Sequence, residues 1–228
     1  MSYSFHDIKH IVEPYLDDLP DHSIPRGDHI EHLRDIFLQC RYYNILFNPH
    51  KCVFCVESRR LLGFIVSKDE IRIDPFKVEV ILCLPPPTSI HQLQSLQGKE
   101  NFSRCFVCNY AKITKGFMLL LKKYVPFMWD DESQRSFNNI KHALTHAPLL
   151  HPPNYARYCI LYLATSTSTV AMVLVQEYDD GQEHVVYNLS KSLFGPKTHY
   201  SHVEKLALAD VIVVQIFCHY ILLHKTIS

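Results

Sequence analysis

The sequence has no excess charge of either sign, because 23 lysine and arginine residues balance 23 aspartate and glutamate residues. This balance excludes a globally basic protein that binds nucleic acid through its net charge, but it leaves a local basic groove open. The N-terminus lacks the basic head and apolar core of a signal peptide. No clean apolar run of the ~20 residues needed for a membrane helix is present, since Asp210, Gln215 and His219 interrupt the most apolar stretch. We therefore expect a soluble, intracellular chain without a membrane partner.

The eight cysteines are neither dense nor evenly spaced, which argues against a disulfide scaffold. Two Cys-x-x-Cys pairs, Cys52/Cys55 and Cys105/Cys108, have the form of half-sites for a Cys₄ zinc centre. The two pairs are farther apart in the chain than in compact zinc modules. Both also lie in apolar segments, where a free cysteine behaves as a small hydrophobic residue. A structural zinc module and buried free thiols are both compatible with this pattern.

The chain is long enough for one or two domains, and a hydrophobic content of 47% with 12% aromatic residues is sufficient for a core. Period and turn signals predict an α+β protein. We expect a β region over 44–64, with short runs at 45–47 and 52–54 and a buried strand over 61–66. Further strands are expected at 71–73, 158–163, 170–176 and 185–187, with a hairpin turn at Asp179 and Asp180. Helices are expected at 29–43, from 74 to before the triple proline 85–87, and at 88–97, 112–123, 131–145 and 202–223.

The stretch with the clearest chemistry is Tyr15-Leu16-Asp17-Asp18. Adjacent aspartates on a straight strand point to opposite faces, but a tight turn can bring both toward one metal ion. Carboxylate oxygens suit Mg²⁺, and two such ions can assist phosphoryl transfer. An Asp-Asp pair is also common on exposed turns, so the tetrapeptide by itself leaves both interpretations open.

The order of motifs along the chain resembles the reverse transcriptase of gypsy-type long-terminal-repeat retrotransposons, especially plant elements. Besides Tyr15-Leu16-Asp17-Asp18, the resemblance rests on segments spread over essentially the whole chain: 28–33, 48–54, 62–67, 73–78, 84–87, 92–99, 120–123, 125–130 and 147–150. It implies the C-terminal half of a polymerase palm with its catalytic hairpin over 1–84. A helical thumb and connection would follow over 85–150, and a partial RNase H-like α/β segment over 151–228.

The resemblance also implies functional residues. In the polymerase part, Asp17 and Asp18 would be catalytic and bind Mg²⁺, and Tyr15 would contribute to the nucleotide site. Glu204 matches the second acidic position of the RNase H site. The partner would be a template-primer or an RNA–DNA hybrid, gripped through basic residues of the thumb-like helices: Lys99, Arg104, Lys112, Lys115, Lys122 and Lys123. A solvated, charge-balanced face is the alternative interpretation of those basic residues.

Departures from the family pattern predict that the isolated chain is catalytically inactive. The fingers and the first palm carboxylate have no counterpart here, so an upstream polyprotein portion is an expected partner. Pro14 and Pro20 flank the hairpin, and proline removes a ladder donor, which predicts a distorted turn. Ala164 stands where the RNase H-like segment would carry its first aspartate, and one carboxylate at Glu204 cannot organise two metal ions. The alternatives are a non-catalytic nucleic-acid-binding remnant and the Cys₄ zinc module.

Overall fold

A computed structural model of the chain describes residues 4–15, 18–22, 29–178, 181–221 and 226–227. The chain divides into two compact units, Met1–Val56 and Glu57–Ser228. The architecture is mixed α and β, with a three-stranded sheet and a four-stranded sheet that are antiparallel except at one short edge pairing. The expected α+β class is therefore confirmed at this level. The expected turn at Asp179 and Asp180 and residue 28 of the motif segment 28–33 lie outside the described residues.

The first unit is built on helix α1 (His29–Tyr42) and the short 3₁₀ helix η1 (His6–Ile8). Its small core consists of Phe5, Ile11, Val12, Ile36 and Cys40. The helix predicted over 29–43 is confirmed, because its apolar residues recur at helical spacing.

The strands predicted at 45–47 and 52–54 are wrong, since neither segment pairs with another strand. Asn44, at φ +54°, turns the chain at the end of α1. Phe47 and Phe54 instead pack edge-on against Phe37 of that helix, with ring centroids 6.1 and 5.9 Å apart. Short apolar runs do not distinguish strand pairing from packing against a helix, which is why the sequence pattern misled.

The second unit begins with the antiparallel sheet β1 (Ser58–Leu61), β2 (Phe64–Ser67) and β3 (Ile71–Ile73), in that order. The single buried strand predicted over 61–66 is wrong, because Leu62 and Gly63 have φ values of +53° and +93°. Two successive left-handed residues form the tight turn of a two-residue hairpin, so Leu61 pairs with Phe64. The strand predicted at 71–73 is confirmed.

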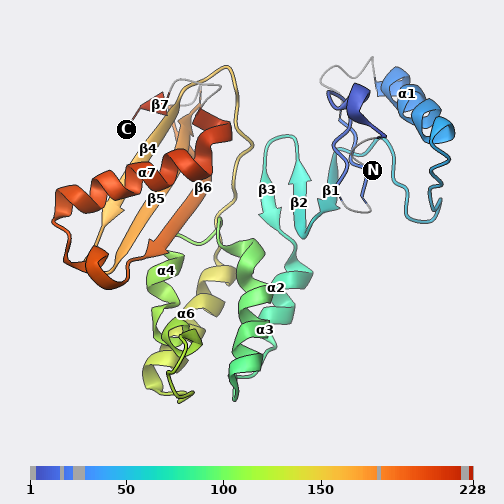
Figure 1. Cartoon of the computed structure of the whole chain (residues 1–228). Coiled ribbons are helices and arrows are strands. Elements are labelled where there is room, and N and C mark those ends of the chain that lie inside the picture. Colours follow the sequence, from blue (N-terminus) through green and yellow to red (C-terminus); the bar gives the residue numbers. More distant parts are fainter. Residues whose placement is uncertain (1–3, 16–17, 23–28, 179–180, 222–225, 228) are drawn as a thin grey trace. The chain divides into compact units, whose positions relative to one another are not determined.

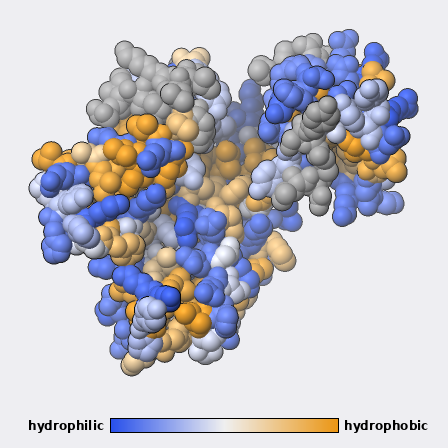
Figure 2. Space-filling model, viewed as in Figure 1, coloured by the Kyte–Doolittle hydropathy of each residue, from blue (hydrophilic) through white to orange (hydrophobic). Residues whose placement is uncertain are grey.

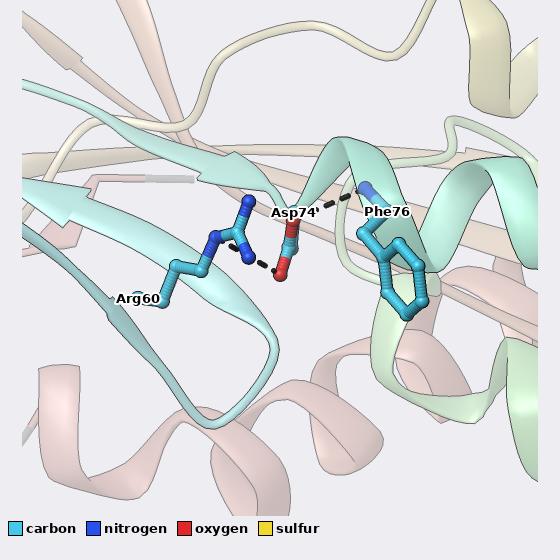
Figure 3. Close-up of polar contacts among 3 residues, drawn as sticks. All are labelled: Arg60, Asp74 and Phe76. Carbon is cyan, nitrogen blue, oxygen red and sulfur yellow. Dashed lines mark hydrogen bonds and ion pairs between the residues drawn. The ribbon is translucent and has the colours of Figure 1, made fainter. Parts of the chain in front are cut away.

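Helix α2 (Pro75–Leu82) starts as predicted, with Asp74 as its cap and proline at its first position. The Asp74 side chain accepts a hydrogen bond from the Phe76 backbone N–H at 3.1 Å. The Arg60 guanidinium of β1 lies 3.5 Å from the other carboxylate oxygen (Figure 3). This contact ties the helix start to the hairpin.

The helical layer comprises α3 (Ile90–Glu100), η3 (Asn101–Ser103), α4 (Tyr110–Ile113), α5 (Lys115–Met118), η4 (Leu119–Leu121) and α6 (Asp131–Thr145). Helix α6 is confirmed at its predicted position. Helix α3 continues through Gly98 to Glu100, beyond the predicted end at 97. The helix predicted over 112–123 is broken into three short pieces. At the first break, the Thr114 hydroxyl donates to the Tyr110 carbonyl and its backbone has ψ 0°. Gly116 then lets α5 approach α6 closely, near Glu132 and Ser136.

The four-stranded sheet has the order β6 (Glu183–Ser192), β5 (Thr169–Glu177), β4 (Cys159–Thr165) and β7 (Thr226–Ile227). The three longer strands confirm the predicted ones. A 3₁₀ helix, η5 (Gly195–His199), leads to α7 (His202–Ile221), which lies across one face of the sheet (Figure 1). Ala209, Val213 and Phe217 are the buried residues of α7 in the core beneath it. Val203, Val211 and Val214 of α7 are exposed. Figure 2 shows apolar surface over this helix.

The helical layer and the four-stranded sheet are joined by specific hydrogen bonds within the second unit. Both the backbone N–H and the side-chain amide of Asn188 donate to the Cys105 carbonyl, at 3.1 and 2.9 Å. The Ala111 N–H donates to the Ser190 hydroxyl at 2.9 Å. These contacts fix the residues of β6 against α4 and the loop that precedes it. Within the described parts of the chain, no helix has the length and apolar character to cross a membrane.

Candidate nucleic-acid interface

The two arms of the predicted catalytic hairpin pair with each other in antiparallel orientation. Tyr15 and Asp18 exchange two backbone hydrogen bonds of 2.9 Å, and the Glu13 N–H donates to the Pro20 carbonyl at 3.1 Å. Pro20 has no N–H, so the reciprocal bond to Glu13 is missing. Pro14 falls between two hydrogen-bonded rungs, where an N–H would point away from the partner strand. The prolines therefore remove one ladder bond; Leu16 and Asp17 in the turn itself lie outside the described residues.

The carboxylates expected to bind Mg²⁺ are only partly placed. Asp18 is exposed, the Tyr15 side chain is 51% exposed, and Asp17 lies outside the described residues. Nowhere in the described ranges do three histidine, cysteine, aspartate or glutamate side chains gather as a metal site would require. The roles of Asp17, Asp18 and Tyr15 and the Mg²⁺ requirement therefore stay predictions.

Ala164 and Glu204, the two positions expected to correspond to RNase H carboxylates, are both described. Ala164, in β4, is exposed and pairs with Ala171 of β5. Glu204 forms a capping box at the start of α7: its carboxylate accepts from the Ser201 N–H at 2.7 Å, and its own N–H donates to the Ser201 hydroxyl at 3.3 Å. Hydrogen bonds from Ser201 lower the pKa of Glu204. The structure thus gives Glu204 a helix-capping contact.

Arg104, predicted to bind nucleic acid, is directed toward the interior of the helical layer. Its guanidinium carbon lies 5.0 Å from the centre of the Tyr110 ring. The Tyr110 hydroxyl donates to the carboxylate of Glu100 at 3.0 Å, and Glu100 is fully buried. Burial raises the pKa of Glu100 to about 7, while the hydrogen bond from Tyr110 and the charge of Arg104 oppose that rise. Sequence analysis missed this buried carboxylate because the predicted helix ends at 97. In the structure α3 continues to Glu100, which extends the buried helix face of Leu93 and Leu96.

Lys99 and the two lysines that follow η4 have exposed side chains. Lys99 lies in the last turn of α3 and lines an open hollow of about 270 Å³ beside Pro85 and Pro87. Lys123 stands over the ring of Tyr124, with its Nζ 5.0 Å from the ring centre. Lys122 stands over Phe194 at 4.5 Å.

Lys115 and Lys122 converge on one surface with residues that flank the strands of the four-stranded sheet. The Lys115 ammonium donates to the Ser168 hydroxyl at 3.2 Å, in the turn between β4 and β5. Lys115, Ser168 and Phe194 line one small hollow, and Lys122 lies over the same Phe194 ring. We call Lys115, Lys122, Ser168 and Phe194 the lysine surface. Ser168 and Phe194 carried no sequence signal for this role, since only the fold brings them to the lysines.

The predicted zinc ligands lie in different units. Cys52 and Cys55 belong to the first unit, and Cys105 and Cys108 belong to the second. Burial raises the pKa of Cys105 to about 11, which disfavours the thiolate that zinc requires. The Cys105 thiol lies 3.8 Å from the Phe102 carbonyl, as its hydrogen-bond donor. The raised pKa and the contact with Phe102 favour a free thiol at Cys105, and the Cys₄ centre stays a prediction.

The part of the chain from α6 to the last strand matches a known protein family. Residues 129–227 match the family model of the RNase H-like domain found in reverse transcriptase. The matched RNase H-like domain includes α6, the four-stranded sheet and α7. It contains Ser168 and Phe194 of the lysine surface, whereas Lys115 and Lys122 precede it.

Relatives along most of the chain are retrotransposon polyproteins. The retrovirus-related Pol polyprotein from transposon opus of Drosophila melanogaster is 30% identical over 208 residues, which cover 86% of this chain and 21% of that polyprotein. The transposon Tf2-3 polyprotein of Schizosaccharomyces pombe is 25% identical over 207 residues, covering 91% of this chain and 16% of the polyprotein. The chain thus spans about a fifth or less of the length of these curated relatives. A retrotransposon reverse transcriptase and RNase H-like segment is supported, without distinction of the gypsy type or of plant elements.

Solved structures share the fold. The foamy viral protease-reverse transcriptase in complex with RNA/DNA hybrid has a TM-score of 0.77 and 20% identity, covering 93% of this chain and 29% of that one. The foamy viral protease-reverse transcriptase in complex with dsDNA has a TM-score of 0.78 and 21% identity, covering 95% and 46%. At this identity the likeness establishes the fold alone.

Proposed function

We propose that this chain is a nucleic-acid-binding segment of a retrotransposon reverse transcriptase that neither polymerises nor cleaves nucleic acid as an isolated chain. An RNA–DNA hybrid or template-primer is its proposed partner, and an upstream polyprotein portion is a second one. The observation that carries the binding role is the lysine surface, where cations of the helical layer meet the RNase H-like domain. The likeness to reverse transcriptases solved with dsDNA and with RNA/DNA hybrid supports the choice of ligand.

The lysine surface has the chemistry of a phosphate contact. Lys115 and Lys122 have exposed side chains, and hydroxyl groups such as that of Ser168 add neutral donors. Lysine and hydroxyl contacts to phosphate oxygens position a duplex without reading its sequence. Because the whole chain has zero net charge, binding depends on this local arrangement and not on a global field.

The residues at positions 164 and 204 support the proposal that the chain does not hydrolyse RNA. The methyl group of Ala164 cannot bind a metal ion. A single carboxylate at Glu204, engaged by Ser201, does not supply the donor set of a two-metal site. For polymerisation, Asp18 is exposed, Asp17 lies outside the described residues, and the described residues hold no cluster of three metal-ligating side chains. The described residues therefore do not fit a complete Mg²⁺ site, and we assign no step to that ion.

Binding is tested by fluorescence anisotropy of a labelled RNA–DNA hybrid over a series of salt concentrations. We expect the double variant Lys115→Ala/Lys122→Ala to bind more weakly and to reduce the salt slope by about 1.8, for two lost phosphate contacts. Lys9 and Lys68 are exposed lysines outside this surface, so Lys9→Ala/Lys68→Ala is the matched control with the same loss of charge. Equal weakening by both double variants would mean that binding is nonspecific, and no binding of wild type at low salt would reject the proposed function.

The catalytic part is tested with the purified chain and Mg²⁺. Primer extension on an RNA template and cleavage of a labelled RNA–DNA hybrid should both remain at the level of the protein-free control. Robust synthesis or cleavage that survives further purification would contradict this part of the proposal.

A further inference from the structure

Tyr124 holds its ring in solvent on a backbone conformation that a bulky residue rarely adopts. The residue is 90% exposed, and its φ is +70°. It closes a tight turn in which the Val125 N–H donates to the Lys122 carbonyl at 3.2 Å. Left-handed backbone favours glycine, and a large side chain adopts it at an energetic cost. The exposed ring recovers little of that cost through burial, so packing does not explain why a tyrosine stands here.

Two exposed aromatic rings accompany two adjacent lysines at this turn. The Lys122 ammonium lies 4.5 Å from the centre of the Phe194 ring, and the Lys123 ammonium lies 5.0 Å from the centre of the Tyr124 ring. Phe194 is 55% exposed. A lone exposed aromatic residue needs no special explanation. Here, however, each ring is paired with a cation, and the rings come from segments far apart in the sequence.

Alternating cations and aromatic rings are the features by which proteins hold single-stranded nucleic acid. Lysines follow the phosphates, and bases stack on ring faces irrespective of sequence. A perfect duplex offers its phosphates to lysines but keeps its bases stacked inside, so exposed rings would add little to duplex binding. Tyr124 and Phe194 therefore favour a ligand with unpaired bases.

We propose that Lys122, Lys123, Tyr124 and Phe194 bind unpaired nucleobases of a single strand, with the two rings as stacking platforms and the two lysines at the phosphates. This inference rests on the proposed nucleic-acid-binding function and specifies the ligand of the same region. It assigns Tyr124 and Phe194 to bases, whereas Lys115 contacts phosphate only. Lys122 serves both ligands.

The test measures binding of the full chain to a single-stranded 12-mer that contains 2-aminopurine, whose fluorescence is quenched on stacking. Stacking contributes about 1–3 kcal/mol per base, so Tyr124→Ala and Phe194→Ala should each weaken binding by about fivefold or more and reduce quenching. Their salt slope should equal that of wild type, because no charge is lost. Tyr124→Ala, outside the lysine surface, should bind the RNA–DNA hybrid as wild type does.

Two further variants separate binding from folding. Tyr124→Gly removes the ring and relieves the backbone, so it should resist urea at least as well as wild type while losing single-strand affinity. Tyr42→Ala removes another exposed tyrosine, which is 77% exposed in the first unit. This variant should leave single-strand affinity and quenching unchanged. An abasic 12-mer with the same phosphates should bind wild type and Tyr124→Ala equally.

The outcomes distinguish this inference from the proposed function. If the hybrid binds through Lys115 and Lys122 but Tyr124→Gly and Phe194→Ala bind the single strand as wild type does, the inference is rejected and the proposed function stands. If wild type binds neither hybrid nor single strand, both are rejected. Equal binding of abasic and normal 12-mers to wild type would also overturn the stacking role.

Discussion

Replacing the buried Glu100 by glutamine should reveal a pH-dependent loss of stability in the helical layer. Burial raises the pKa of Glu100 from its ordinary 4.5 to about 7, one of its oxygens accepts from Tyr110, and the other has no hydrogen-bond partner. The folded state therefore binds more protons than the unfolded state between these pH values, and stability falls as pH rises through that window. At about 1.4 kcal/mol per pKa unit, the ionised carboxylate costs about 3 kcal/mol above pH 7.

Glu100→Gln removes the ionisation and keeps an oxygen that can accept from Tyr110. We expect the variant to match wild type near pH 4.5 and to exceed it in free energy of unfolding by about 3 kcal/mol at pH 8. Unfolding by urea can be followed by the fluorescence of Trp129, the only tryptophan. Trp129 packs against the same hydrophobic core as α3, the helix that carries Glu100. Both proteins contain the same fifteen histidines. Their contribution therefore cancels in the difference between the two free energies of unfolding. A difference that stays constant from pH 5 to pH 8 would refute the reasoning.

Three further predictions concern glycine, a half-buried lysine and the capping box. Gly116→Ala should lower the free energy of unfolding by about 1–3 kcal/mol, because its Cβ would lie 2.7 Å from the Glu132 carbonyl oxygen of α6. Gly98→Ala, in open space within α3, should raise it by about 0.5–1 kcal/mol, and urea midpoints compare the two. Lys141→Met should cost about 1–3 kcal/mol in the same assay, since its ammonium donates to two backbone carbonyls at 2.7 Å. Glu204→Ala should lower the urea midpoint equally with and without Mg²⁺; a loss seen only with Mg²⁺ would contradict the capping role.

Much of the regular structure followed from local signals. Asp74 before Pro75 and Asp130 before α6 are caps whose oxygens satisfy helix N–H groups, so they mark helix starts without any tertiary information. The order of motifs pointed to a reverse transcriptase and RNase H-like segment, and the comparisons support this relationship. The runs at 45–47 and 52–54 were misread because pairing depends on a partner strand that local composition does not reveal.

The amino-acid sequence by itself determined the charge balance and the helix caps, because each depends on residue identity or on near neighbours. Only the tertiary structure decided which charged side chains are exposed at the surface and which are directed into the core. Arg104 and Glu100 lie together under Tyr110, whereas Lys115 and Lys122 meet Ser168 and Phe194 from distant parts of the chain. Burial and long-range contact are properties of the packed chain, since they arise when segments far apart in sequence exclude water between them.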